Sequence, residues 1–203
     1  MMNKQTFVSF ALITIALFFS GCGSSPTARL YILNTIDREN AAMPALTAAH
    51  HNVAVKVGPV SIPDTLDQPQ IITRLGQNSL LADEFNRWSG DFQEDIQRII
   101  GENISILLPT NQVMLSQEVN LLPFDYQVVV NIREFDGALA GVVTLNADWT
   151  VSGKGKEKAV TAKKSVLQEN TVGTDYSAYV AAQSRLLAKL SQEITEEIKR
   201  QLK

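Results

Sequence analysis

The sequence is poor in the residues from which catalytic and metal sites are usually built. It contains one cysteine, Cys22, and two histidines, His50 and His51. A single cysteine permits no internal disulfide. Adjacent histidines rarely converge on one metal ion, and the surrounding segment, which is rich in alanine, offers no third ligand. We therefore expect two solvated loop histidines, no metal site and no catalytic residue.

Nucleotide-binding and hydrolase signatures are also missing. The chain has no P-loop, no Gly-x-Gly-x-x-Gly pattern and no Gly-x-Ser-x-Gly elbow, so we expect no cofactor. Two pairs of adjacent carboxylates, Asp83-Glu84 and Glu196-Glu197, lack a supporting set of polar residues and are expected on solvated faces. Trp88 and Trp149 are expected to pack in the core or at an edge.

Charge of either sign is scarce. The chain has 18 basic and 21 acidic residues, a formal net charge of −3, and nothing in this balance points to nucleic acid as a partner. A small basic tip at residues 153–158 is expected to be a solvated turn, and contact with anionic lipid headgroups is the alternative. The hydrophobic fraction of 45% is sufficient for one sizeable core.

An apolar run, residues 7–19, stands out near the N-terminus. It is too short for a membrane span, which takes about 20 apolar residues, but it fits the core of a secretory signal peptide. The run leads into Phe19-Ser20-Gly21-Cys22, which resembles the lipobox of bacterial lipoproteins. Because a thiol is a good nucleophile, it is readily alkylated by a lipid group. The pattern predicts cleavage after Gly21 and lipidation of Cys22; a plain signal peptide with an incidental cysteine is the alternative.

This cleavage site divides the chain into three parts. Residues 1–21 are the predicted signal peptide, residues 22–28 a small, polar, lipidated tether, and residues 29–203 the domain. Two or three acyl chains anchor a protein durably, because each buried methylene contributes about 0.8 kcal/mol. In lipoproteins of enteric bacteria, aspartate after the cysteine tends to retain the protein in the inner membrane. Gly23 stands there, which favours the outer membrane, with the domain facing the periplasm.

Hydrophobic periodicity predicts two long helices and several strands in the domain. Helices are predicted at 89–108, capped by Ser89, and at about 175–202, capped by Thr174 or Asp175. Residues 37–52 are predicted as a loop with an optional helical stretch at 45–49. Strands are predicted from β-branched and alternating segments at residues 29–35, 53–57, 71–74, 79–81, 112–115, 126–135, 142–151 and 158–169.

The order of these elements predicts a single-domain α/β fold. Each helix has one apolar stripe, which must be buried against other elements. We expect one mixed β-sheet covered by the two long amphipathic helices. Glu193, Glu196 and Glu197 are expected on the polar side of the last helix or at its margin.

Several segments follow one another in a recognisable order and spacing. They are the lipobox followed by Leu30-Tyr31-Ile32-Leu33, then Val57 to Leu66, Asn78-Ser79-Leu80-Leu81 with Trp88, Val128 to Gly137, and Tyr179 to Ile198. In these segments the chain resembles the PqiC/YmbA family of ABC-transport auxiliary lipoproteins, and the resemblance covers most of the mature chain. Leu66, where the family often has tyrosine, and the long loop at 37–52 depart from the family pattern.

The resemblance implies a non-enzymatic role in lipid transport. Lipoproteins of this kind sit on the inner face of the outer membrane and accompany an MCE-type periplasm-spanning protein and an inner-membrane ABC transporter. The implied partners are the bilayer, through lipidated Cys22, the MCE-type protein and the transporter. A homo-oligomeric ring is compatible with this role, because a hollow conduit across the periplasm needs an opening where it ends. Two alternatives stay open: a structural or assembly lipoprotein of another envelope complex, and a periplasmic hydrolase that depends on His50 or His51.

Overall fold

The structure is a computed structural model that describes residues 26–36, 53–116, 123–155 and 160–202. The predicted signal peptide, Cys22, both histidines and part of the basic tip lie outside these residues. Among the described residues, no helix has both the length and the apolar character needed to cross a membrane.

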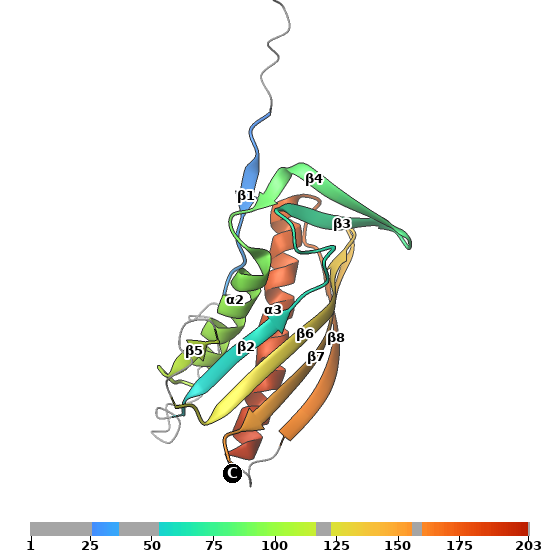
Figure 1. Ribbon diagram of the computed structural model, residues 1–203. Coiled ribbons are helices and arrows are strands. Elements are labelled where there is room, and N and C mark those ends of the chain that lie inside the picture. Colours follow the sequence, from blue (N-terminus) through green and yellow to red (C-terminus); the bar gives the residue numbers. More distant parts are fainter. Residues whose placement is uncertain (1–25, 37–52, 117–122, 156–159, 203) are drawn as a thin grey trace, which may run out of the picture.

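The described residues form one mixed α/β domain with two sheets and two helices (Figure 1). One sheet has five strands in the order β5-β2-β6-β7-β8, and the other has three in the order β1-β4-β3. The helices are α2 (Phe92–Leu107) and α3 (Tyr176–Gln201). The strands are β1 (Arg29–Tyr31), β2 (Val55–Ser61), β3 (Gln70–Gly76), β4 (Ser79–Trp88), β5 (Val113–Leu115), β6 (Tyr126–Gly137), β7 (Val142–Gly153) and β8 (Val160–Asn170).

The single sheet expected from the sequence is thus two sheets. β1 pairs in parallel with β4, and β4 folds back on β3 as an antiparallel hairpin. β2 pairs in parallel with both β5 and β6, and β6, β7 and β8 are antiparallel. The chain passes from one sheet to the other through a segment that contains Pro63 and Pro69. Proline lacks an N–H group and so cannot donate to a strand ladder, which separates β2 from β3.

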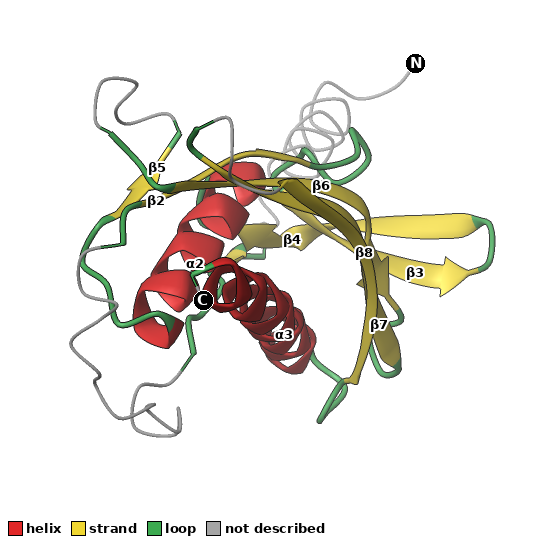
Figure 2. Ribbon diagram, turned by 90° about the horizontal axis from the view of Figure 1, so that it is seen from below, coloured by secondary structure: helices red, strands yellow, loops and turns green. Residues whose placement is uncertain are grey.

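Both helices lie on the same face of the five-stranded sheet, as Figure 2 shows. α2 packs on β2 and β5, whereas α3 packs on β7 and β8. The stripe predicted for α2 is buried because its residues recur at spacings of three and four, and the same holds for α3. On the opposite face, alternate side chains of β6 and β7 are only partly buried. The fully buried leucine and isoleucine side chains of the helices are Ile96, Ile99, Ile100, Ile104, Leu186, Leu187, Leu190, Ile194 and Ile198.

The helix starts differ in how well the sequence predicted them. The N-cap of α3 is Asp175, as predicted, and its carboxylate accepts the backbone N–H of Ala178 at 2.8 Å. The N-cap of α2 is Asp91 and not Ser89. Its carboxylate accepts the N–H of Glu94 at 2.8 Å, three residues ahead, which is the geometry that stabilises a helix start.

The first strand is shorter than predicted because the backbone that follows it forms hydrogen bonds with side chains of the helices. β1 ends at Tyr31, whereas the sequence predicted a strand through residue 35. Beyond it, three backbone N–H groups donate to side chains of the two helices. These bonds join Leu33 to Asp95 (3.1 Å), Asn34 to Ser184 (3.1 Å) and Ile36 to Asn103 (2.8 Å).

One end of the domain gathers the elements that matter for the candidate site. β1, the β3–β4 hairpin and the first turns of α2 and α3 all lie there, and the chain on the N-terminal side of β1 leaves the domain at this point (Figure 1). We call this the N-terminal end. The β3–β4 hairpin projects sideways from it, and the C-terminus of α3 lies at the opposite end.

Candidate functional site

The residues singled out from the sequence do not come together in one site. Cys22, His50 and His51 lie outside the described residues, so the predicted lipidation and the solvated histidines stay predictions. Within the part of the chain that the structure describes, no three His, Cys, Asp or Glu side chains are grouped as a metal site would require. The two carboxylate pairs lie on different elements, β4 and α3.

Asp83 stabilises local structure instead of standing free on a solvated face. Its carboxylate accepts the N–H groups of Phe85 (2.8 Å) and Asn86 (2.9 Å), and the hydroxyl of Tyr176 donates to it at 3.1 Å. Partial burial opposes ionisation, but these hydrogen bonds outweigh it and lower the pKa of Asp83. The carboxylate therefore shapes the bend of β4 and ties it to the start of α3.

Glu197 is buried, which corrects its predicted place on the polar side of the last helix. Only 1% of its side chain is exposed. The guanidinium of Arg200, the ammonium of Lys163 at 3.0 Å and the hydroxyl of Thr161 at 2.8 Å surround its carboxylate. These partners, Arg200 above all, outweigh the cost of burial and lower the pKa of Glu197 to about 2. Gln201 also donates to the carboxylate, at 3.2 Å, and β8 supplies two of the four partners, so the cluster holds α3 against the edge of the sheet.

The two tryptophans are core residues, as predicted. Trp88 stacks on Phe92 with ring centroids 4.1 Å apart. Trp149 donates its indole N–H to the hydroxyl of Ser165 at 2.8 Å. Both residues are almost fully buried, so each contributes mainly to packing.

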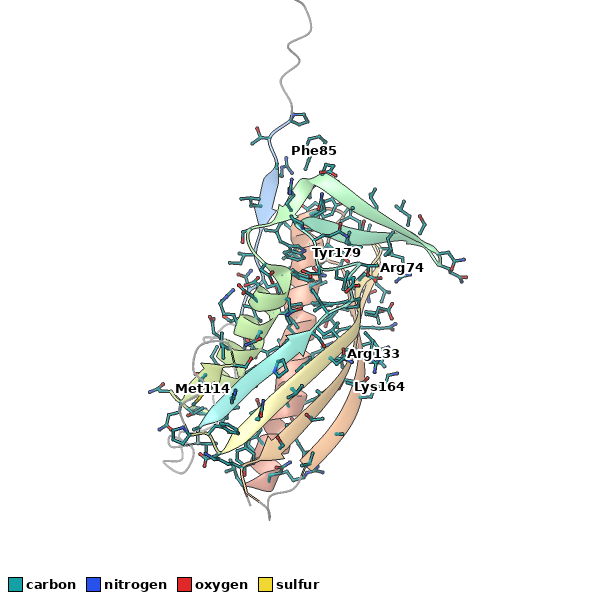
Figure 3. All side chains as sticks on the ribbon, viewed as in Figure 1. Arg74, Phe85, Met114, Arg133, Lys164 and Tyr179 are labelled. Atoms are coloured by element: carbon teal, nitrogen blue, oxygen red, sulfur yellow. The ribbon has the colours of Figure 1, made fainter. Side chains whose placement is uncertain are left out.

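A buried tyrosine joins helix α3 to the three-stranded sheet. The hydroxyl of Tyr179, on α3, donates to the backbone carbonyl of Ile72, on β3, at 2.9 Å. Burial raises the pKa of Tyr179, so its hydroxyl stays protonated and acts as a donor. Figure 3 labels Tyr179 at the N-terminal end, close to the root of the hairpin.

A cavity at this root contains mostly charges that are already paired. It has a volume of about 410 Å³ and lies between β3, β4 and β6. Arg74 donates to both carboxylate oxygens of Asp136, at 2.6 and 3.0 Å, and Arg133 donates to Asp148 at 2.8 Å. Since each arginine has a carboxylate partner, this cavity is a poor candidate for binding an anion.

A second cavity, of about 360 Å³, is the better candidate for a binding site. It lies at the N-terminal end, between the end of β1 and the first turns of α2. Its apolar lining is formed by Tyr31, Ile32, Trp88, Phe92 and Leu115, and we call it the aromatic groove. Charged side chains of α2 stand at its rim, namely Asp91, Glu94, Asp95 and Arg98. Aromatic side chains inside a charged rim are typical of protein-binding surfaces.

Sequence reasoning missed the aromatic groove because its residues come from separate segments. Ile32 follows β1, Trp88 ends β4, and Leu115 belongs to β5. The parallel pairing of β1 with β4, together with a hydrogen bond of 2.9 Å from the N–H of Ser89 to the carbonyl of Tyr31, brings the first two together. Leu115 is placed separately, by the pairing of β5 with β2. Only the recurrence of aromatic residues near the predicted helix start could have hinted at it.

Comparison with solved structures supports this fold. One similar structure, titled only as an uncharacterized protein, has a TM-score of 0.68 and 18% identity over 85% of this chain and 99% of its own. Another, from Xanthomonas campestris, has a TM-score of 0.60 and 17% identity over 84% of this chain and 90% of its own. At these identities the likeness concerns the fold. Comparison with curated proteins gave no match.

The family itself is shown by sequence. The model of a family described as the ABC-type transport auxiliary lipoprotein component matches residues 31–195, which is most of the chain. This match confirms the resemblance drawn from the strand and helix segments. The chain belongs to the family of ABC-type transport auxiliary lipoproteins.

Proposed function

We propose that the protein is a non-enzymatic docking subunit of an MCE-type ABC lipid-transport system, held on the inner face of the outer membrane by lipidated Cys22. The observation that carries this proposal is the family match over residues 31–195. The apolar run and the Phe19-Ser20-Gly21-Cys22 segment agree with the lipoprotein part of the family description.

The shape of the domain fits a subunit that stands on a membrane. The tether leads to β1 at the N-terminal end (Figure 1). α3 has 26 residues and so extends about 39 Å away from that end. The domain therefore reaches from the membrane into the periplasm, where a periplasm-spanning partner can contact it.

We place the docking contact at the aromatic groove. Its apolar lining offers a partner side chain a place to be buried, and its charged rim can select the partner by charge. Ile32 is the most suitable residue for a test, because its side chain is exposed and the core does not depend on it.

Affinity capture tests both parts of this proposal. Tagged full-length protein, extracted in detergent from its native host, should enrich an MCE-type protein and an ABC transporter. Ile32→Asp should lose this enrichment, whereas Val166→Asp, which changes an equally exposed aliphatic side chain on β8, should keep it. A wild-type capture that never contains an MCE-type protein would contradict the docking function. Undiminished capture by Ile32→Asp would contradict only the location of the contact.

A further inference from the structure

Exposed apolar side chains are concentrated on the three-stranded sheet. Of the ten large hydrophobic side chains that are exposed among the described residues, six belong to β1, the residue after it and the β3–β4 hairpin. One of the six, Ile32, lines the aromatic groove. We call the other five the apolar arm: Leu30, Leu75, Leu80, Leu81 and Phe85.

The hairpin exposes leucine on both of its faces. Leu80 stands opposite Arg74 and Leu81 opposite Thr73 in the β3–β4 register. Successive residues of a strand point to opposite faces, so Leu80 and Leu81 project in opposite directions. Leu75, near the turn, is 67% exposed. Leu80 also lines the cavity at the root of the hairpin, so one face of the arm looks partly towards the domain, whereas Leu81 on the other face looks away from it. The exposed leucines beyond the root give the arm the character of an element that enters apolar surroundings.

The length of the tether identifies those surroundings. Arg29, the first residue of β1, follows Cys22 by seven positions. A fully extended chain of that length spans about 25 Å at most. Because β1 is hydrogen-bonded to residues 86–88 of β4, a lipid on Cys22 keeps this end of the three-stranded sheet within that distance of the bilayer, and the rest of the hairpin projects sideways from the same end of the domain (Figure 1). The tether sets no comparable limit on the distance between the arm and a second copy of the chain, so we take the bilayer as the occupant.

Two arginines of the same strands suit the headgroup layer. Arg29 and Arg87 lie diagonally across the β1–β4 pair, where they can meet lipid phosphates. Phe85, Asn86 and Tyr176 donate hydrogen bonds to the carboxylate of Asp83, so this group keeps hydrogen-bond donors where water is scarce.

We propose that the apolar arm inserts into the interface of the bilayer that holds lipidated Cys22, at the boundary between headgroups and acyl chains. This inference rests on the proposed function, because it requires the lipid anchor, and it adds a second membrane contact to it. Leucine and phenylalanine are typical of segments that lie about 5–10 Å deep in that layer. The inserted arm fixes the orientation of the domain, which a flexible tether alone cannot do.

Fluorescence quenching in vesicles tests the insertion. Cys22 is the only cysteine, and lipidation uses its sulfur. Phe85→Cys and Leu75→Cys therefore each provide one free thiol for an environment-sensitive fluorophore on the full-length lipidated protein. The protein is reconstituted into vesicles of phosphatidylethanolamine and phosphatidylglycerol that contain nitroxide-labelled lipid. The matched control is Lys164→Cys, an exposed residue of β8 that lies away from the N-terminal end (Figure 3).

The expected result is strong quenching at positions 85 and 75, greater with nitroxides near the headgroup than with nitroxides near the chain end, and none at position 164. Absence of quenching at both arm positions, in protein that floats with the vesicles, would overturn the inference, whether water or a second copy then covers the arm. If such protein still captures an MCE-type partner, the docking function survives. Protein that does not float would overturn the lipid anchor and the arm insertion together.

Discussion

Glu197 gives the sharpest prediction for the stability of the fold. Its pKa of about 2 in the folded protein lies below the ordinary value of 4.5, so ionised Glu197 favours folding. A difference of this size corresponds to about 3 kcal/mol at neutral pH. Arg200 and Lys163 are 64% and 44% exposed, so water compensates them in part when the carboxylate is lost. We expect Glu197→Gln to lower the free energy of unfolding by about 2 kcal/mol at pH 7.

The pH dependence separates this electrostatic effect from a packing effect. Because the folded pKa is the lower one, the contribution of Glu197 is complete above pH 4.5 and is lost as the pH falls towards 2. Urea unfolding followed by tryptophan fluorescence should show wild type and Glu197→Gln converging over that range. Glu196→Gln, an exposed neighbour, is the control and should differ from wild type by less than about 0.5 kcal/mol. A difference between wild type and Glu197→Gln that stays constant from pH 7 to pH 2 would refute the reasoning.

Three further predictions concern the lipid anchor at Cys22, the hydrogen bond between α3 and β3, and the glycine at the end of β6. Cys22→Ala should abolish incorporation of labelled palmitate, and unchanged incorporation would disprove the lipobox. Tyr179→Phe should lower the free energy of unfolding, measured in urea, by about 1 kcal/mol, because the buried carbonyl of Ile72 loses a hydrogen-bond donor. A variant as stable as wild type would show that this hydrogen bond contributes nothing. Gly137→Ala should lower the free energy of unfolding by about 2–3 kcal/mol, because a Cβ there would lie 2.6 Å from a Cα of β7. The control, Gly76→Ala, has open space around it and should be nearly neutral. Equal effects of the two substitutions would contradict this account.

The sequence predicted the regular elements well where one period dominated a long segment. The stripe that includes Ile96, Ile100 and Ile104 predicted α2 to within a few residues, and long runs of β-prone residues predicted β6 and β7. β4 was predicted only for residues 79–81 but continues to Trp88. The second half of β4 has no alternating pattern. The strand continues because it pairs with β1 and with Gln70, which are distant in sequence.

The division into two sheets and the candidate surfaces were not predictable in this way. They depend on the parallel pairing of β1 with β4, two segments more than fifty residues apart, and no local pattern encodes that pairing. The placement of Glu197 depends likewise on β8, which brings Lys163 and Thr161 against α3. A charged residue near the margin of a helix stripe becomes a buried one when its neighbours supply counter-charges.

The three backbone bonds of residues 33–36 have a mechanical consequence. Any tension between the N-terminal segment and the rest of the domain passes along β1 and into Asp95, Ser184 and Asn103, which belong to two different helices. Since β1 also runs parallel to β4, stretching strains several hydrogen bonds at once instead of breaking them one after another. A pull on the N-terminal segment therefore loads the β1–β4 ladder first, and the three bonds to the helices hold the chain in place if the strand is peeled away.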